Sequence, residues 1–216
     1  MDTDTPKTKL IWATPDGDRL AGYIARVSNP ANQNNPDATG LIRYCLKNGH
    51  WSVFEMVNAC IEVNTTRDIA RQILRHQFKF QEFSQRYQDV SALGTLTTRE
   101  CRMQDTKNRQ NSLPADDGYI STWWETTQRV HTASTMALYQ QALANGIAKE
   151  QARALLPEGM TPSRLYMQGT VRNFIHWIQV RTDPSTQKEH REVAESAKRD
   201  LYGAFPMIME AAFGPQ

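Results

Sequence analysis

Apolar positions in this chain follow a strand-like pattern near the amino terminus and a helix-like pattern over most of the remainder. A short apolar run at residues 9–13 ends at a Pro-Asp-Gly-Asp turn, and residues 57–63 alternate between apolar and polar side chains, so both segments are predicted strands. Apolar residues that recur every three or four positions predict helices over residues 18–26, 41–47, 67–76, 119–145, 148–155 and 186–202.

Several predicted helices carry residues that favour helix ends. Thr65 or Thr66 can cap the helix that begins at residue 67. Gly49 and Gly146 follow the last periodic residues of two other helices, where a residue free to adopt a positive φ is favoured. These residues support the helix boundaries independently of the apolar period.

Two segments have a less clear period. Residues 163–180 combine apolar side chains with Arg164, Arg172 and a following Arg181, which predicts a buried helix with charged ends. Residues 91–117 are polar and weakly periodic, so we expect loops or an insertion there and not a separate domain. Because the strands precede the helices and 216 residues suit one domain, the chain is predicted to form a single α+β domain over residues 1–216.

Composition narrows the class of protein. A net charge of +2 and the lack of any Lys/Arg run argue against nucleic acid as a partner. No apolar run is long enough to span a bilayer and the first residues show no signal-peptide pattern, so we expect a protein of the reducing cytoplasm without a membrane partner. Cys45, Cys60 and Cys101 are widely spaced without matching histidines, which predicts core or boundary thiols and no metal site.

The segment from Arg75 to Tyr87 mixes charged, amide and aromatic side chains more closely than a solvated surface or a plain core would. Such a mixture suits a half-buried wall against a flat, anionic ligand, because guanidinium groups bind phosphate oxygens and aromatic side chains pack against ring faces. The same residues also suit a surface helix-to-loop junction with a few salt bridges. The segment by itself leaves both interpretations open.

Five arginines in apolar or amide-rich contexts raise the same question: Arg75, Arg86, Arg153, Arg172 and Arg181. A buried guanidinium needs an anion or several acceptors. Either acidic side chains pair with these arginines or ligand phosphates neutralise part of their charge; the acids considered are Glu82, Glu150, Glu158, Asp183 and Glu189. Common nucleotide-cradle, zinc-protease and serine-hydrolase motifs are absent, so an enzyme of this sequence would depend on a bound cofactor for its chemistry.

These residues resemble the signature of the flavin-dependent thymidylate synthases. That family carries Arg-His-Arg, seven further residues and Ser, closing as Glu-x-Ser-x-Arg-Tyr; here Arg75-His76 opens the pattern and residues 82–87 close it in full. Three other elements stand in the family's order: the His-Trp-Ser-Val-Phe-Glu, Ala-Arg-Ala-Leu-Leu-Pro and Thr-Gln-Lys-Glu runs at residues 50–55, 152–157 and 186–189. The likeness covers residues 10–202, nearly the whole chain.

The resemblance implies an α+β fold with a central, mostly antiparallel sheet flanked by helices, assembled as a homotetramer with active sites at subunit interfaces. The implied reaction is the reductive methylation of dUMP at C5 to give dTMP. Methylenetetrahydrofolate would supply the carbon and NADPH-reduced FAD the hydride. The family needs no enzyme nucleophile on C6, which fits a chain without a reactive-looking cysteine.

The resemblance also implies roles for individual positions. dUMP would be bound by Gln72, Arg75, Glu82, Ser84, Gln85, Arg86, Arg153 and Arg181. Arg181 and Ser84 would act in catalysis, with Arg181 near the uracil edge, where its charge stabilises negative charge developing on the ring. The flavin would be lined by Asn58, Arg75, His76, Gln77, Glu82, Thr170, Val171, Arg172 and His176. His176 could instead be a core histidine, and Arg181 an ordinary structural arginine.

Two positions depart from the family pattern. Gln77 stands where the second Arg is expected, in a signature one residue shorter, and Met56 replaces the His that usually follows the Phe-Glu pair. One lost Arg–anion contact, worth roughly 1.5–3 kcal/mol, would weaken flavin binding by about an order of magnitude or more unless Lys79 supplies the charge. Two alternatives follow: a related folate- and flavin-dependent C5 modification such as hydroxymethylation, or a nucleotide-binding homologue without catalysis.

Overall fold

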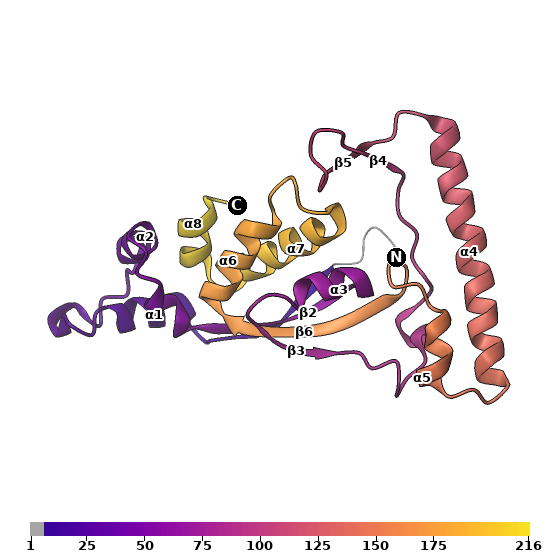
Figure 1. The fold of residues 1–216 in the computed structure, drawn as a ribbon. Helices are drawn as coiled ribbons and strands as arrows, with labels where there is room; N and C mark the ends of the chain where they lie inside the picture. The colour runs from indigo at the N-terminus through magenta and orange to yellow at the C-terminus, as the bar shows by residue number, and fades with distance from the viewer. Residues whose placement is uncertain (1–6) are drawn as a thin grey trace.

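A four-stranded antiparallel sheet with the strand order β1-β2-β6-β3 forms the centre of the protein (Figure 1). The structure is a computed structural model that describes residues 7–216, so the first residues, in which we found no signal-peptide pattern, lie outside the described residues. The strands of this sheet are β1 (Thr8–Ala13), β2 (Asn58–Thr66), β3 (Lys79–Glu82) and β6 (Pro162–Thr170). The strands predicted at residues 9–13 and 57–63 are confirmed as β1 and β2.

The inner strand β6 was not predicted. It pairs with β2 along its whole length and with β3 on its other side. The predicted buried helix over residues 163–180 is therefore wrong, because only the second half, α6 (Val171–Arg181), is helical. Buried Leu165 and Met167 alternate with exposed Arg164 in the first half, which is the period of two of a strand with one face on the core.

The helix before β3 is shorter than predicted, and the segment after it forms a strand where we expected a loop. We predicted a helix over residues 67–76 that runs directly into a loop. The helix α3 (Arg67–Ile73) ends three residues earlier, and the following segment turns back into the edge of the sheet as β3. The charged and aromatic motif is thus held between a helix end and a strand.

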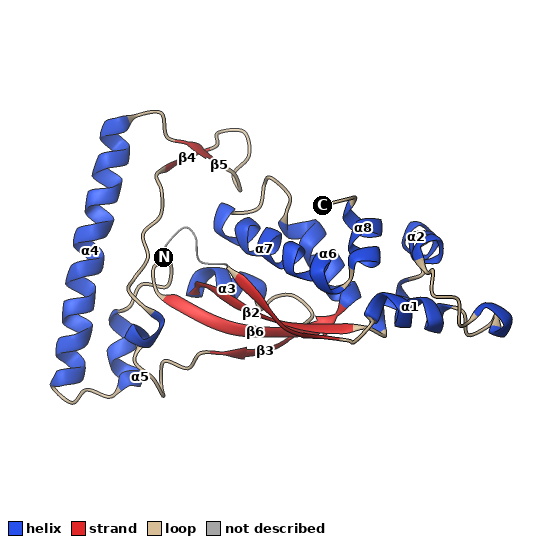
Figure 2. Cartoon of the chain, turned by 180° about the vertical axis from the view of Figure 1, so that it is seen from behind, coloured by secondary structure: helices blue, strands red, loops and turns tan. Residues whose placement is uncertain are grey.

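Helices cover one face of the sheet and extend beyond both of its ends (Figures 1 and 2). α3, α6 and α7 (Lys188–Ala204) lie over that face, and α8 (Pro206–Phe213), which was not predicted, packs on α7 and on α2. The helices beyond the ends are α1 (Gly17–Ala25) and α2 (Thr39–Lys47) at one end, and α4 (Gly118–Ala144) and α5 (Lys149–Ala152) at the other. The helix predicted over residues 148–155 is split into α5 and a 3-10 turn at Arg153–Leu155.

The main core lies between the sheet and its helices. Met167 of β6 and Phe174 and Trp177 of α6 are fully buried in it. The opposite face of the sheet is polar, and there the hydroxyl of Tyr166 donates a hydrogen bond to Glu62. An antiparallel sheet with one apolar and one polar face needs a helical layer on only one side.

Helix ends follow the predicted residues with one difference. Gly49 and Gly146 have φ angles of +69° and +79° after α2 and α4, which confirms their predicted positions. Thr66 is the residue before α3, but its hydroxyl donates to the carboxylate of Asp68 and accepts no hydrogen bond from a backbone N–H of the helix.

The three cysteines are free thiols. Cys45 and Cys60 are buried, and burial raises the pKa of both thiols, whereas Cys101 is half-buried. This confirms the predicted core and boundary positions. Within residues 7–216, no group of three or more His, Cys, Asp or Glu side chains is placed to hold a metal ion, and no helix is long and apolar enough to cross a membrane.

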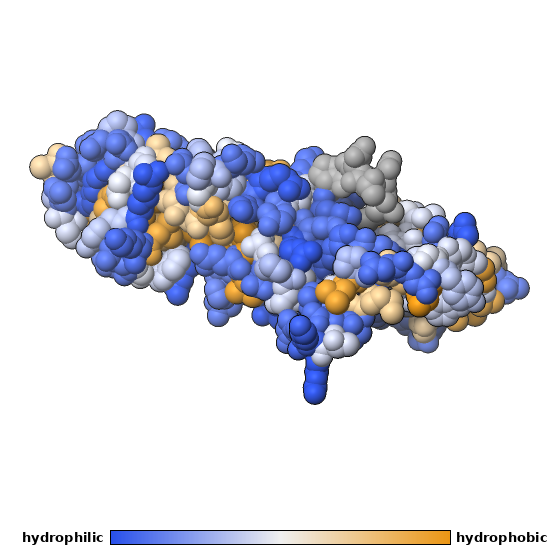
Figure 3. Space-filling model, turned by 90° about the horizontal axis from the view of Figure 1, so that it is seen from above, coloured by the Kyte–Doolittle hydropathy of each residue, from blue (hydrophilic) through white to orange (hydrophobic). Residues whose placement is uncertain are grey.

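Residues 91–117 are largely loop, as predicted, but they also contain a two-stranded hairpin. Its strands are β4 (Arg102–Gln104) and β5 (Ser112–Pro114). The hairpin leads into α4, a helix of 27 residues that stands beside the sheet (Figure 2). Figure 3 shows apolar patches at both ends of an otherwise polar surface, and the exposed apolar residues of α4 include Tyr119, Trp123, Val130 and Leu138.

Candidate active site

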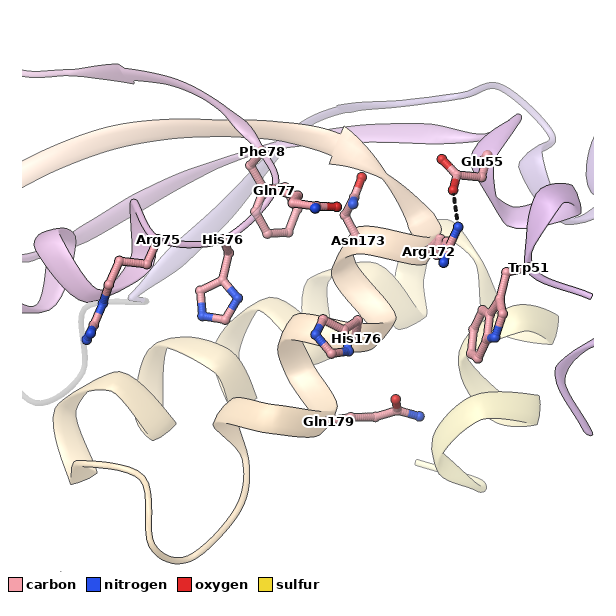
Figure 4. Close-up of a pocket in the computed structure, with 10 residues that line it drawn as sticks. All are labelled: Trp51, Glu55, Arg75, His76, Gln77, Phe78, Arg172, Asn173, His176 and Gln179. Atoms are coloured by element: carbon pink, nitrogen blue, oxygen red, sulfur yellow. Dashed lines mark hydrogen bonds and ion pairs between the residues drawn. The ribbon is translucent and has the colours of Figure 1, made fainter. Parts of the chain in front are cut away.

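A cavity of about 480 Å³ opens between α6, the 3-10 turn Trp51–Glu55 and the segment that joins α3 to β3 (Figure 4). Its lining combines cations, amides and aromatic rings: Trp51, Glu55, Arg75, His76, Gln77, Phe78, Arg172, Asn173, His176 and Gln179. Five of these residues were predicted to line a flavin, namely Arg75, His76, Gln77, Arg172 and His176. The structure brings these five together although they come from distant parts of the sequence.

The polar wall of the cavity is one face of α6. Arg172, His176 and Gln179 lie four and three residues apart, which places them on the same side of the helix. Phe174 and Trp177 point to the opposite side and are fully buried. Because His176 is exposed and lines the cavity, it is not the core histidine that we had considered as an alternative.

The start of α6 is fixed by Thr170 and Asn173. The Thr170 hydroxyl accepts a hydrogen bond from the Asn173 backbone N–H, while the Asn173 side-chain oxygen accepts one from the Thr170 backbone N–H. Thr170 and Val171, both predicted near the flavin, thus form the beginning of this helix without lining the cavity. Asn58 lies next to Thr170 across the β2–β6 ladder and is hydrogen-bonded to Thr14.

The close approach of Phe78 to the strand β6 requires a glycine. A Cβ atom at Gly169 would lie 2.5 Å from Cδ1 of Phe78. The Phe78 ring also packs against Phe174, with ring centroids 4.8 Å apart, and against Trp177 at 6.1 Å. Phe78 therefore anchors the segment that carries Arg75 and the other signature residues.

Two cations and a histidine meet beside the cavity: Arg75 and His76 line it, and Arg181 contacts His76 from outside the lining. Nε of Arg181 donates a hydrogen bond to Nε2 of His76 across 2.9 Å, so that nitrogen carries no proton and the ring is neutral. Burial, followed by the charges of Arg181, His176 and Arg75, lowers the pKa of His76 to about 4. Burial and the neighbouring Arg75 also lower the pKa of Arg181.

Two of the five arginines, Arg172 and Arg86, have acidic partners among the described residues. Arg172 pairs with Glu55 and its guanidinium lies 6.0 Å from the ring centre of Trp51, while Arg86 pairs with Glu150 at 3.2 Å. Within residues 7–216, no carboxylate lies within 4.0 Å of the three other arginines, which are Arg75, Arg153 and Arg181. Arg75 and Arg181 therefore form a positively charged place that favours an anionic ligand.

The remaining predicted nucleotide-binding residues lie outside this cavity. Ser84 and Arg86 are exposed on the loop after β3, and Arg86 contacts the α5 region near Arg153 through Glu150. Gln85 is buried, and its side-chain nitrogen has no hydrogen-bond partner among the described residues. We call Ser84, Gln85, Arg86 and Arg153 the outer cluster. A single chain does not bring the outer cluster into the cavity.

Gln72 and Glu82 form hydrogen bonds with other side chains of this protein. The Gln72 amide donates to Gln187 at 2.8 Å, and its oxygen lies 3.2 Å from Nδ1 of His190. Glu82 accepts a hydrogen bond from Ser163. It also lies 3.8 Å and 3.7 Å from the guanidinium groups of Arg67 and Arg71.

The two residues that depart from the family pattern, Gln77 and Met56, lie in different parts of the structure. Gln77 lines the cavity, whereas Met56 is exposed and does not line it. Lys79, our candidate for replacing the missing charge, lies on β3 and is also outside the cavity lining. Gln77 is thus the departure that changes the charge of this cavity.

Sequence reasoning missed several cavity residues. Asn173 and Gln179 were not predicted to lie at the site. Because the helix was predicted to begin at residue 163, the polar face of α6 was not recognised. Trp51 and Glu55 lay within the family-like element at residues 50–55 but were not assigned to the site. Phe78 was noted for its aromatic character only, and its packing against Gly169 could not be read from the sequence.

An α+β domain with a cavity of cations, amides and aromatic rings has the features of a site for flat, anionic ligands. A family model described as thymidylate synthase complementing protein matches residues 9–207. The chain is 49% identical over 207 residues to a probable flavin-dependent thymidylate synthase of Paramecium bursaria Chlorella virus 1, covering 94% of this chain and 93% of that protein. It is also 49% identical over 199 residues to the flavin-dependent thymidylate synthase of Synechocystis sp., covering 92% and 89% of the two chains.

A solved structure gives the same result for the fold. The crystal structure of the UMP/dUMP methylase PolB from Streptomyces cacaoi, bound with 5-Br dUMP, superposes with a TM-score of 0.82 at 27% identity and covers 96% of this chain and 95% of its own. The chain belongs to the flavin-dependent thymidylate synthase family. The resemblance found in the sequence motifs is thereby confirmed.

Proposed function

We propose that this protein converts dUMP to dTMP by reductive methylation at C5. Methylenetetrahydrofolate supplies the carbon, and FAD reduced by NADPH supplies the hydride. The C5 hydrogen of dUMP leaves as a proton, and tetrahydrofolate and NADP⁺ are the other products. The observation that carries this proposal is the pair of guanidinium groups of Arg75 and Arg181, which lack carboxylate partners within residues 7–216 and flank the neutral His76.

The cavity residues fit a flavin. Trp51 offers an aromatic surface, Arg75 offers positive charge for a pyrophosphate, and Gln77 and the other amides can bind the edge of a ring system. Arg172 offers further hydrogen-bond donors beside its partner Glu55. Bound FAD would supply hydride transfer, which no side chain of this protein provides. The protein's residues would hold the ring, exclude water from it and fix its position against the nucleotide.

Arg181 is proposed to act at the pyrimidine edge of the nucleotide. Its charge is permanent, and its hydrogen bond to His76 fixes the direction of the guanidinium. Negative charge that develops on the uracil ring as C5 becomes nucleophilic is stabilised by such a preorganised cation. Ser84 and the other residues of the outer cluster are proposed to bind the phosphate and sugar, since Arg153 has no carboxylate partner within the described residues.

The separation of the outer cluster from the cavity supports an oligomer with interfacial sites. We propose a homotetramer in which the outer cluster of one subunit completes the cavity of another. The exposed apolar residues of α4 support this proposal, because apolar side chains exposed in a single chain favour burial in an interface. The free thiols are consistent with action in the cytoplasm.

The test is a visible absorption spectrum of the purified protein with FAD, followed by addition of dUMP and analysis of the product. Flavin bands that shift with dUMP, and a product with the mass of dTMP, are expected when all co-substrates are present. A product heavier by one oxygen would instead identify hydroxymethylation. Binding of dUMP by a protein that never takes up FAD would identify a nucleotide-binding homologue without catalysis.

A further inference from the structure

A fully buried histidine lies directly behind the charged end of the cavity. His190 of α7 has an exposed fraction of 0% and packs between Trp177 and Gln72. Its ring centre is 6.3 Å from that of His76. It lies outside the cavity lining and outside the motifs that resemble the family signature, so no role has been assigned to it above.

The partners of His190 decide which ring nitrogen carries the proton. Nε1 of Trp177 lies 3.2 Å from Nε2 of His190, and an indole nitrogen can only donate. Nε2 must therefore accept, which leaves the proton of the neutral ring on Nδ1. Nδ1 lies 3.2 Å from Oε1 of Gln72 and can donate to it. Burial, followed by the charges of Arg181 and the neighbouring groups, lowers the pKa of His190 to about 3, in agreement with a neutral ring.

The hydrogen bonds continue from Gln72 in one direction. The Gln72 amide nitrogen donates to Oε1 of Gln187 at 2.8 Å, and the Gln187 amide nitrogen donates to Oε2 of Glu189 at 3.0 Å. A carboxylate can only accept, so the chain ends there. An obligatory donor at one end and an obligatory acceptor at the other fix the orientation of both amides between them.

The far end of this chain reaches the hairpin β4–β5. Nη2 of Arg102, on β4, donates to the other oxygen of Glu189 at 2.6 Å. Arg99 also lies 4.0 Å from that carboxylate. Glu189 is thus held in place by cations of the hairpin segment, and it can accept from Gln187 without moving.

We propose that His190 is a positioning residue, which acts through Gln72 to fix the end of α3 from which Arg75 and His76 extend toward the nucleotide. The proposal rests on the proposed function, because it treats Gln72 and Arg75 as nucleotide-binding residues. Without His190, the Gln72 oxygen loses its donor, and only the bond from the amide nitrogen to Gln187 holds the carboxamide in place. The orientation set from Glu189 remains, but the side chain is restrained at one end only, which weakens its contact with the nucleotide.

A double-mutant cycle on dUMP affinity tests this proposal. His190→Phe keeps a ring in the core and removes both hydrogen bonds, and Gln72→Met removes the amide at similar volume. Each substitution alone is expected to weaken dUMP binding about fivefold to tenfold, measured by titration calorimetry. In the double variant the losses are expected not to multiply, because His190 acts through Gln72. Losses that multiply, or an unchanged affinity in His190→Phe, would overturn the proposal.

Controls separate positioning from folding and from the proposed function. His131→Phe changes an exposed histidine of α4 and should leave dUMP affinity unchanged. If His190→Phe does not fold, Trp177→Phe removes the donor to Nε2 together with part of the buried indole that packs on Phe78, so its unfolding free energy is measured beside its dUMP affinity, which should fall about threefold. Failure of the unaltered protein to bind dUMP would contradict the proposed function, whereas normal binding that is insensitive to both substitutions would contradict only the role of His190.

A spectroscopic measurement tests the same proposal without any ligand. The chain has five histidines, so ¹⁵N labelling of histidine gives few signals. The signals of His190, assigned by their loss in a His190 variant, should show a protonated Nδ1 and an unprotonated Nε2. A protonated Nε2 would break the bond from Trp177 and overturn the proposed direction of the chain.

Discussion

Nε of Arg181 donates a hydrogen bond to Nε2 of His76 across 2.9 Å, so a permanently charged side chain holds a histidine in its neutral form. The two residues lie 105 positions apart in the sequence. Arg181 ends α6, and His76 follows α3, so the contact depends on how these helices pack over the sheet. This pair therefore links α6, which forms the polar wall of the cavity, with the signature segment that follows α3.

The stability of the ligand-free protein should fall as the pH decreases from about 6.5 to about 4. The pKa of His76 is lowered from 6.5 to about 4 in the folded protein, so the unfolded chain takes up a proton over this range and the folded protein does not. His190, whose pKa is lowered to about 3, adds an effect of the same sign. The midpoint of thermal unfolding, measured between pH 8 and pH 4, checks this expectation.

Histidine substitutions assign this pH dependence. His76→Gln should reduce the fall in melting temperature because its side chain does not titrate. His131→Gln, at an exposed position on α4, should leave the fall as it is in the unaltered protein. Identical curves for His76→Gln and the unaltered protein would show that His76 does not contribute.

Removing the charge of Arg181 should weaken nucleotide binding strongly. Arg181→Met is expected to reduce dUMP affinity by roughly ten- to a hundredfold, since a hydrogen bond to a charged group is worth about 1.5–3 kcal/mol. Arg164→Met changes an exposed arginine on the polar face of the sheet, which pairs with Glu62, and should have no effect. Calorimetric titration with dUMP measures both; equal affinities would remove Arg181 from the site.

A methyl group at Gly169 should disturb the cavity through Phe78. The added Cβ would lie 2.5 Å from Phe78 Cδ1, so Gly169→Ala should destabilise the protein by about 1–3 kcal/mol and weaken flavin binding. Gly203→Ala is the matched control, because a Cβ there meets nothing within 4 Å and the residue lies in α7. It should stabilise the protein by about 0.5–1 kcal/mol. Urea unfolding curves give both values, and a harmless Gly169→Ala would mean that Phe78 can move at little cost.

Restoring the family's arginine at position 77 should strengthen flavin binding. Gln77 lines the cavity, so Gln77→Arg adds a cation there and is expected to increase FAD affinity by about an order of magnitude. Lys79→Met removes a charge outside the cavity lining and should change FAD affinity little. Fluorescence titration of FAD measures both. An effect of Lys79→Met as large as that of Gln77→Arg would show that Lys79 reaches the flavin after all.

The local pattern was sufficient where an element's own residues decide its structure. The strand β1 is a short apolar run that ends at a turn, and β2 alternates between apolar and polar residues. Gly49 and Gly146 could be assigned to the ends of α2 and α4 because few other residues adopt a positive φ. The cavity residues Arg75 and Arg172 were found through family motifs. Those motifs are short and retain their order along the chain.

The sequence by itself determined the class of this protein, most of its helices and the family to which it belongs, because these depend on local periods and on motifs. Only the tertiary structure decided that residues 162–170 form an inner strand, since pairing on both sides outweighs a helix-like run of apolar residues. It alone also decided that Arg172 and Arg86 have acidic partners while Arg181 faces His76. Side-chain charges are neutralised by neighbours in space, and the spacing along the chain does not specify those neighbours.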